Sequence, residues 1–146
     1  MINHTSGLQS YGSVPTTRPL KDIDVLRIVA RQDSTNFKPG TKFSYSNTAY
    51  VLLGLIVEKA SGLRFDEFVR RHIFKPLRMY NSTFNNLEGR ISNRAYGYNP
   101  KNGKLVVDDQ SSARYLQGDG GIYSSIDDFY HWDQALYAEK LSESKP

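Results

Sequence analysis

The chain has 146 residues, of which 38% are hydrophobic and 23% charged, and it contains no cysteine. These values favour a folded globular chain over a disordered one, and the missing cysteines exclude disulfides, thiol nucleophiles and thiolate metal sites. The net charge of +4 comes from dispersed basic residues with one adjacent pair, Arg70 and Arg71. A nucleic-acid-binding surface concentrates Lys and Arg and interleaves them with aromatic residues, so we expect no nucleic-acid partner.

Neither a metal nor a cofactor is expected. The three histidines, His4, His72 and His131, lie far apart in the sequence and lack the spacing with which two histidines of one helix share a metal ion. A membrane span is not expected either, because the sequence contains no apolar run of roughly 18 residues, the length that a spanning helix needs.

Two helices are predicted in the first half of the chain. Asp22 or Asp24 is a suitable cap for a helix that runs through residues 25–30. The second helix, over about residues 47–60, is nearly all apolar, which predicts a central, buried helix. Gly62 follows it where a left-handed C-cap glycine is common.

The second half of the chain contains two further helices and one hairpin. A helix is predicted over residues 65–74, with its apolar face made by Phe65, Phe68, Val69 and Ile73. Asn102-Gly103 is a strong hairpin turn signal between extended segments. Ser125 is a suitable N-cap for the last helix, whose apolar face at helical spacing is Ile126, Phe129, Trp132, Leu136 and Tyr137. The predicted fold class is therefore mainly α with a small β-hairpin, with too few strands for a large sheet.

Three sequence blocks carry a resemblance. The first is His-Thr-Ser-Gly-Leu at residues 4–8, the second spans residues 39–62 and continues at 76–79, and the third spans 120–132. In this order and spacing they resemble the middle of the serine hydrolase family that contains class C β-lactamases, D,D-peptidases and esterases. The resemblance covers essentially the whole chain. It implies that residues 1–146 are the helical subdomain of a β-lactamase-like α/β fold and lack most of its sheet.

The resemblance also implies a chemistry, which is acyl transfer by a serine from a Ser-x-x-Lys motif. Tyr45-Ser46-Asn47 matches the second motif of the family, so Tyr45 is the candidate catalytic residue and Asn47 the candidate substrate contact. Gly120 and Gly121 are expected at the rim of the acyl pocket, as further substrate-binding residues. The implied substrate is a small molecule or peptide, namely a β-lactam, a D-alanyl peptide or an ester. The resemblance also implies that the protein is located in the bacterial periplasm or cell envelope, or is secreted.

The tripeptide has a simpler interpretation as well. Ser46 and Asn47 are good N-cap residues, and Tyr45 could simply pack; the two interpretations are compatible. A tyrosine has a pKa of about 10 in water and is a poor base at neutral pH unless a cation stabilises its phenolate. His4 and Ser6 are interpreted as a structural loop hydrogen-bonded to backbone, because buried polar groups need partners.

The other two motifs of the family are missing. The one Ser-x-x-Lys match, Ser142–Lys145, lies in the polar tail after Tyr45, and the Lys-x-Gly at Lys101–Gly103 lies on the predicted hairpin turn. We interpret both as coincidences and expect the chain to begin and end inside the family domain and to be inactive by itself. The alternative is a non-catalytic helical module that binds a partner or self-associates through apolar surface.

Overall fold

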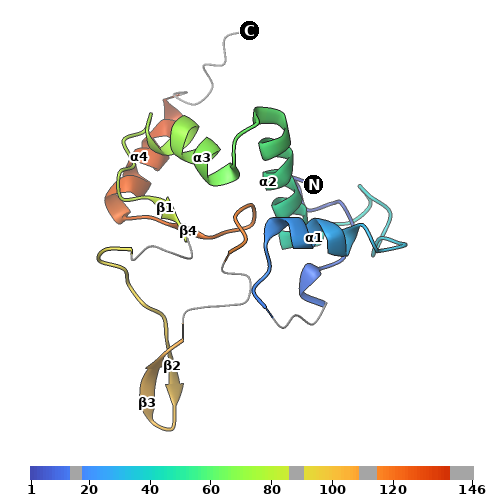
Figure 1. Ribbon diagram of the computed structural model, residues 1–146, viewed down its shortest axis with the longest axis horizontal. Coiled ribbons are helices and arrows are strands. Elements are labelled where there is room, and N and C mark those ends of the chain that lie inside the picture. The colour runs from blue at the N-terminus through green and yellow to red at the C-terminus, as the bar shows by residue number, and fades with distance from the viewer. Residues whose placement is uncertain (14–17, 86–90, 109–114, 139–146) are drawn as a thin grey trace.

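The computed structural model describes residues 1–13, 18–85, 91–108 and 115–138. Within these ranges the chain is mainly helical, as predicted, and it has two short antiparallel strand pairs, of which one is the predicted hairpin. Figure 1 shows helices α1 (Asp22–Val29) and α2 (Asn47–Ser61) on one side of the molecule and α3 (Phe65–Val69) and α4 (Ile126–Tyr137) on the other. None of the described helices is long and apolar enough to cross a membrane. The tail that carries Ser142–Lys145 lies outside the described residues.

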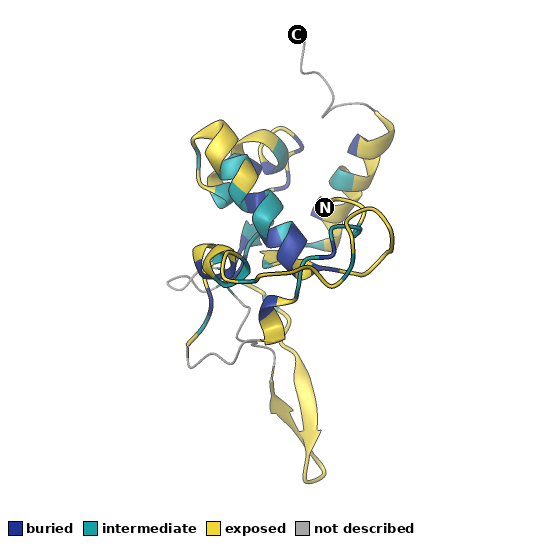
Figure 2. Ribbon diagram, turned by 90° about the vertical axis from the view of Figure 1, so that its right-hand side faces the viewer, coloured by how far each residue is buried: buried dark blue, intermediate teal, exposed yellow. Residues whose placement is uncertain are grey.

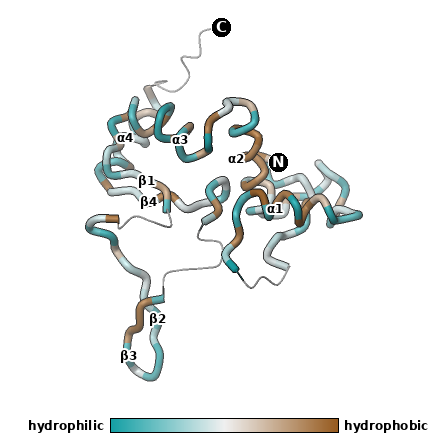
Figure 3. The backbone as a smooth tube through the Cα atoms, in the orientation of Figure 1, coloured by the Kyte–Doolittle hydropathy of each residue, from teal (hydrophilic) through white to brown (hydrophobic). Residues whose placement is uncertain are grey.

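Helix α2 begins and ends where its capping residues predicted. The Ser46 hydroxyl accepts a hydrogen bond from the Ala49 backbone N–H at 3.1 Å, and Gly62 ends the helix with a left-handed φ of 70°. The predicted burial of the helix is partial: Thr48, Ala49, Val51 and Gly54 are buried, whereas Ile56 is 54% exposed. Apolar residues nevertheless run along the length of the helix, as Figure 3 shows.

Helix α1 starts one residue earlier than its aspartates suggested. Lys21 is the N-cap, so neither Asp22 nor Asp24 occupies that position, but Asp24 belongs to a capping box with Lys21. Asp24 instead lies in the first turn, where its carboxylate accepts the Lys21 backbone N–H at 3.0 Å and both terminal nitrogens of Arg18 at 2.9 Å. The hydrogen bonds from Arg18, followed by that from Lys21, lower the pKa of Asp24 to about 2.

This pairing predicts a stability difference that depends on pH. Asp24 has a lowered pKa in the folded chain, so it stabilises the fold above its unfolded pKa of about 3.9, and this contribution is lost as the pH falls towards about 2. Arg18→Gln removes the largest cause of the shift. We expect the variant to be less stable than the unmodified chain at neutral pH, with the gap narrowing between about pH 4 and pH 2. Urea unfolding at a series of pH values measures the gap, and one that stays constant with pH would contradict the assignment.

Helix α3 continues into the π-helical turn η2 (Arg70–Phe74), so the predicted helix over residues 65–74 is correct in extent. The wider turn was not predicted. The predicted apolar face packs into one core cluster that joins α3, η2, β1 (Thr83–Phe84) and α4. Its buried members are Val69, Phe74, Leu77, Met79, Phe84 and Ala135, with Phe65, Phe68, Ile73 and Trp132 packed against them.

The apolar face predicted for helix α4 is mostly exposed. Ser125 caps the helix as predicted, since its hydroxyl accepts the Asp128 N–H at 3.2 Å. Its buried residues, however, are Asp128 and Ala135, whereas Ile126 is 88% exposed. Exposure of the same face continues at Phe129, Leu136 and Tyr137, and only Trp132 is half-buried. The buried Asp128 carboxylate accepts hydrogen bonds from the Asn81 backbone N–H at 2.8 Å and from the Ser82 hydroxyl at 2.7 Å.

The predicted hairpin is present, between β2 (Tyr98–Lys101) and β3 (Lys104–Val107). Its turn residues Asn102 and Gly103 have φ values of 52° and 74°, the left-handed pair that a two-residue hairpin turn uses. Every residue of both strands is exposed, and Figure 2 shows the hairpin projecting from the helices. The second strand pair, β1 with β4 (Ile122–Tyr123), was not predicted.

Candidate active site

Tyr45 and Asn47 lie at the start of α2, on either side of its N-cap. The Ser46 side chain points inwards and is buried, whereas Asn47 is exposed and Tyr45 is 69% exposed. The capping role of Ser46 and a role of its two neighbours at the surface are therefore compatible. The local sequence accounts for this arrangement, because an extended N-cap residue turns away from the residues that flank it.

His4, near the N-terminus, holds the Tyr45–Asn47 segment in place. Its Nδ1 accepts the Ser46 backbone N–H at 3.1 Å, and its ring stacks on Tyr50, with centroids 4.9 Å apart. The Tyr45 ring packs against the same imidazole, with the ring centroids 4.6 Å apart. Ser6 accepts the Leu8 N–H at 3.5 Å. The predicted structural role of the loop at residues 4–8 is confirmed, since His4 and Ser6 both bond to backbone.

The second candidate segment is the loop at residues 118–121, which packs directly against α2. A side chain on Gly118 would lie 2.8 Å from the Val51 Cα and would collide with the Tyr50 carbonyl oxygen. Gly121 has a left-handed φ of 80°, and a Cβ there would lie 2.7 Å from the Leu116 carbonyl oxygen. Gly120 is exposed, and a Cβ on it would meet nothing within 4 Å. Gly121 is thus required by the backbone, and Gly120 is the glycine with open space before it.

Tyr11 joins the two segments, and the sequence contained no signal for it. Its backbone N–H donates to the Thr48 hydroxyl at 3.0 Å, and its phenol donates to the Asp119 carboxylate at 2.7 Å. Asp119 is the residue before Gly120, and Thr48 is the residue after Asn47. The link therefore brings the Tyr45–Asn47 segment beside the glycine loop, as a shared site requires.

Burial shifts the pKa values of the two hydrogen-bonded groups, the Tyr11 phenol and the Asp119 carboxyl. It raises the pKa of the Tyr11 phenol well above its usual value, and the neighbouring Asp119 carboxylate raises it further. Burial also raises the pKa of Asp119, whereas the hydrogen bond from Tyr11 lowers it. Tyr11 accordingly remains a protonated phenol and a hydrogen-bond donor at neutral pH.

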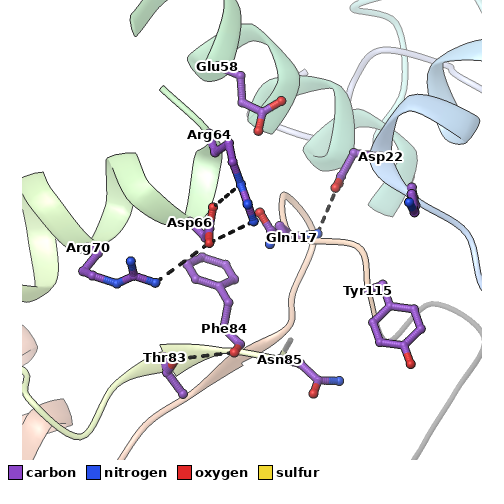
Figure 4. A pocket seen from close by; sticks show the side chains of 11 residues that line it. Asp22, Glu58, Arg64, Asp66, Arg70, Thr83, Phe84, Asn85, Tyr115 and Gln117 are labelled. Carbon is purple, nitrogen blue, oxygen red and sulfur yellow. Dashed lines mark hydrogen bonds and ion pairs between the residues drawn. The ribbon is translucent and has the colours of Figure 1, made fainter. Parts of the chain in front are cut away.

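A polar cavity of about 380 Å³ lies apart from these residues, between α1, α2, α3 and β1 (Figure 4). Asp22 points into it and accepts the Gln117 N–H at 3.1 Å. Burial raises the pKa of Asp22, and Glu58 across the cavity adds to this. The Glu58 carboxylate accepts the Phe65 N–H at 2.8 Å. Neither Tyr45 nor Asn47 lines this cavity, and no cluster of acidic or histidine side chains suited to a metal ion occurs within the described ranges.

Comparison with known proteins decides the family. The family model described as Beta-lactamase matches residues 1–145. The chain belongs to the β-lactamase family. The resemblance inferred from the three sequence blocks is thereby confirmed.

One relative of this β-lactamase family chain is penicillin-binding protein 4* of Bacillus subtilis, which is 32% identical to it over 159 aligned residues. The alignment covers 95% of this chain and 35% of that protein. Among solved structures, the D-amino acid amidase of Ochrobactrum anthropi, complexed with L-phenylalanine amide, superposes with a TM-score of 0.78 at 25% identity and covers 95% of this chain and 42% of the amidase. The octameric penicillin-binding protein homologue of Pyrococcus abyssi has a TM-score of 0.74 at 26% identity and covers 99% of this chain and 37% of that one. The chain thus spans about a third of the curated relative's length.

Proposed function

We propose that this chain supplies the Tyr45 and Asn47 part of a serine acyl-transfer site, and that residues 1–146 are the helical part of a larger β-lactamase-like domain. The observation that carries the proposal is the arrangement at the start of α2. Tyr45 and Asn47 are exposed on either side of a buried cap, beside the loop that contains Gly120 and Gly121. The family membership and the amidase likeness support the same chemistry.

The proposed reaction has two steps. The serine hydroxyl attacks the carbonyl carbon of the substrate while its proton passes towards the Tyr45 phenolate, and the leaving amine or alcohol takes up a proton as the acyl-serine forms. Water then attacks the acyl-serine and releases the acid. Asn47 holds the substrate through its amide, and the open space before Gly120 accommodates the acyl group.

Tyr45 needs a cation to act as a base near neutral pH. In the described part of the chain, the cation–aromatic contacts are those of Arg94 with Tyr96 and Tyr123, away from Tyr45. We infer that the cation is the lysine of the Ser-x-x-Lys motif, together with the nucleophile. No such motif precedes Tyr45 in the sequence, and Lys101–Gly103 lies on the exposed hairpin turn. The isolated chain is therefore inactive, because removing a nucleophile costs orders of magnitude in rate.

The test is hydrolysis by the protein encoded by the complete reading frame. A chromogenic β-lactam, a D-alanyl peptide, a D-amino acid amide and an aryl ester present the candidate acyl groups, and the isolated chain is assayed beside it. Turnover of at least one substrate by the complete protein, and of none by the isolated chain, supports the proposal. If the complete protein hydrolyses none of the four, the proposal is wrong.

A second property follows from the surface of α4. Ile126, Phe129, Leu136 and Tyr137 are each more than half exposed. An apolar cavity of about 720 Å³ opens beside them, lined by residues of α3, η2, β4 and α4. Apolar surface of this extent favours association, and one structural relative is described as octameric. We propose that the isolated chain self-associates through this face, which is the non-catalytic alternative.

The association has a direct measurement. Sedimentation of the isolated chain at micromolar concentrations is expected to show a dimer or larger species, and Ile126→Ser combined with Phe129→Ser should shift it towards monomer because two exposed apolar side chains are lost. Tyr80→Ser is the matched control, since Tyr80 is 78% exposed but lies outside α4. A monomer at every concentration, or an equal effect of the control, would rule out this face.

A further inference from the structure

The polar cavity between α1, α2, α3 and β1 is lined by charges of both signs. Its volume of about 380 Å³ is that of a small-molecule site. Among the described residues, three basic and three acidic side chains line it, so their formal charges cancel. They are Lys21, Arg64, Arg70, Asp22, Glu58 and Asp66. Because a binding site is complementary in charge to what it binds, this lining favours a ligand that is neutral overall but carries both a positive and a negative group.

Asp22 and Glu58 provide the acidic side of the cavity. The Asp22 carboxylate accepts the Gln117 backbone N–H at 3.1 Å, and the Glu58 carboxylate accepts the Phe65 backbone N–H at 2.8 Å. Both acidic residues are half-buried. Within the described ranges, neither carboxylate is paired with a basic side chain. A carboxylate has about four acceptor sites, so each of these two can accept further hydrogen bonds from a cation.

A positive charge would offset the repulsion between these two carboxylates. Burial raises the pKa of Asp22, and the negative charge of Glu58 raises it further. An ammonium group placed beside both carboxylates would replace this repulsion by two attractions. Its three N–H groups would donate into the acceptor sites that the backbone N–H groups leave open.

Arg64 and Arg70 provide the basic side of the cavity, and they share one counterion. The Asp66 carboxylate accepts hydrogen bonds from Nε and Nη2 of Arg64 at 3.1 Å and 3.2 Å, and Nη2 of Arg70 lies 3.8 Å from it. Two guanidinium groups thus face one carboxylate, which leaves one positive charge in excess. The two arginine side chains are 75% and 63% exposed. A second carboxylate can therefore reach them from solvent and bind through parallel N–H donors.

We propose that this cavity binds a zwitterionic amino acid or dipeptide, with the ammonium group at Asp22 and Glu58 and the carboxylate at the arginines. Figure 4 shows Asp22 and Arg70 on opposite sides of the cavity. The rings of Phe84 and Tyr115 also line it, where they can contact an apolar part of the ligand. The cavity is separate from the proposed acyl-transfer site, so this binding goes beyond the proposed function.

The experiment is a titration of the isolated chain followed by ¹⁵N–¹H spectra. Alanine and dialanine are the zwitterionic probes, N-acetyl-dialanine lacks the ammonium group, and dialanine amide lacks the carboxylate. The Gln117 and Phe65 backbone N–H resonances report on the cavity, because they donate to Asp22 and Glu58. We expect at least one zwitterion to move both resonances with a millimolar or lower Kd, and the two singly charged compounds to bind roughly tenfold more weakly. The Ala49 N–H, which bonds at the start of α2, should stay in place.

Three variants test the two ends of the ligand. Glu58→Gln keeps an oxygen that can accept the Phe65 N–H but removes the negative charge, so it should weaken binding of the zwitterion and of dialanine amide by roughly tenfold or more. Arg64→Gln should weaken binding of the zwitterion without weakening that of dialanine amide, because the amide has no carboxylate. Glu67→Gln is the matched control, since Glu67 is an exposed residue of α3 that does not line the cavity.

Three outcomes would overturn the proposal. The first is that both resonances stay in place in about 20 mM of either zwitterion, far above a millimolar Kd. The second is that N-acetyl-dialanine binds as tightly as dialanine, because the ammonium group would then have no role. The third is an equal loss of binding in Glu67→Gln, which would trace the effect to net charge instead of the cavity. None of these readouts involves hydrolysis, so they are independent of the proposed acyl transfer.

Discussion

Tyr45→Phe is expected to lower kcat of the complete protein by roughly a hundred- to ten-thousandfold, the usual contribution of a positioned general base. The phenylalanine keeps the ring that leans on His4 at 4.6 Å and removes only the hydroxyl. Because Tyr45 is 69% exposed, the loss of its hydroxyl leaves no buried polar group without a partner. The variant should therefore fold normally and bind substrate, but acylate slowly.

The kinetic measurement is burst and steady-state hydrolysis of whichever substrate the unmodified protein accepts. Thermal unfolding of the variant serves as the check on folding. Tyr80→Phe is the control, because it removes a phenol hydroxyl from a similarly exposed side chain. A kcat within about twofold of the unmodified protein, far short of the effect of a general base, would remove Tyr45 from the mechanism.

The second large effect is expected at Gly118, where alanine should destabilise the isolated chain by about 3 kcal/mol or more. The added methyl group would collide with the Tyr50 carbonyl oxygen and lie 2.8 Å from the Val51 Cα. Both obstacles are backbone atoms of α2, which cannot rotate away as a flexible side chain can. Either the loop lifts from α2, or the helix shifts against the buried residues that cluster with Val51, namely Tyr11, Leu20, Val25 and Leu116.

Gly120→Ala is the matched control two residues away, because a Cβ there meets nothing within 4 Å. Urea unfolding followed by the fluorescence of Trp132, the single tryptophan, measures both variants. We expect the Gly120 variant to stay within about 0.5 kcal/mol of the unmodified chain, as surface changes usually do. Equal stability of the two variants would show that the loop does not rest on α2 as described.

Local signals predicted the parts of the fold that depend on neighbouring residues. Ser46 and Gly62 marked the ends of α2, and Asn102-Gly103 marked the hairpin turn, because caps and turns are satisfied within a few residues. At α1 the aspartates indicated the helix start but not its N-cap residue. Lys21 is the N-cap, and Asp24 accepts its backbone N–H from the first turn, as part of a capping box, while it also binds Arg18.

Features that depend on distant parts of the chain could not be predicted. Helical spacing identified the apolar residues of α4, but spacing does not say whether another element covers them, and Ile126 is 88% exposed. The link from Tyr11 to Asp119 crosses 108 residues of sequence. A tyrosine in a polar stretch carries no mark of such a partner, so this part of the candidate site emerged only from the structure.

We propose that Tyr45 and Asn47 serve a serine that lies outside residues 1–146. Intact-mass measurement after treatment with a fluorophosphonate probe tests it most directly, on the complete protein and on the isolated chain side by side. We predict one probe per complete protein, which peptide mapping places on a serine outside residues 1–146, and none on the isolated chain. Stoichiometric labelling of any serine within residues 1–146 would show that the nucleophile lies in this chain.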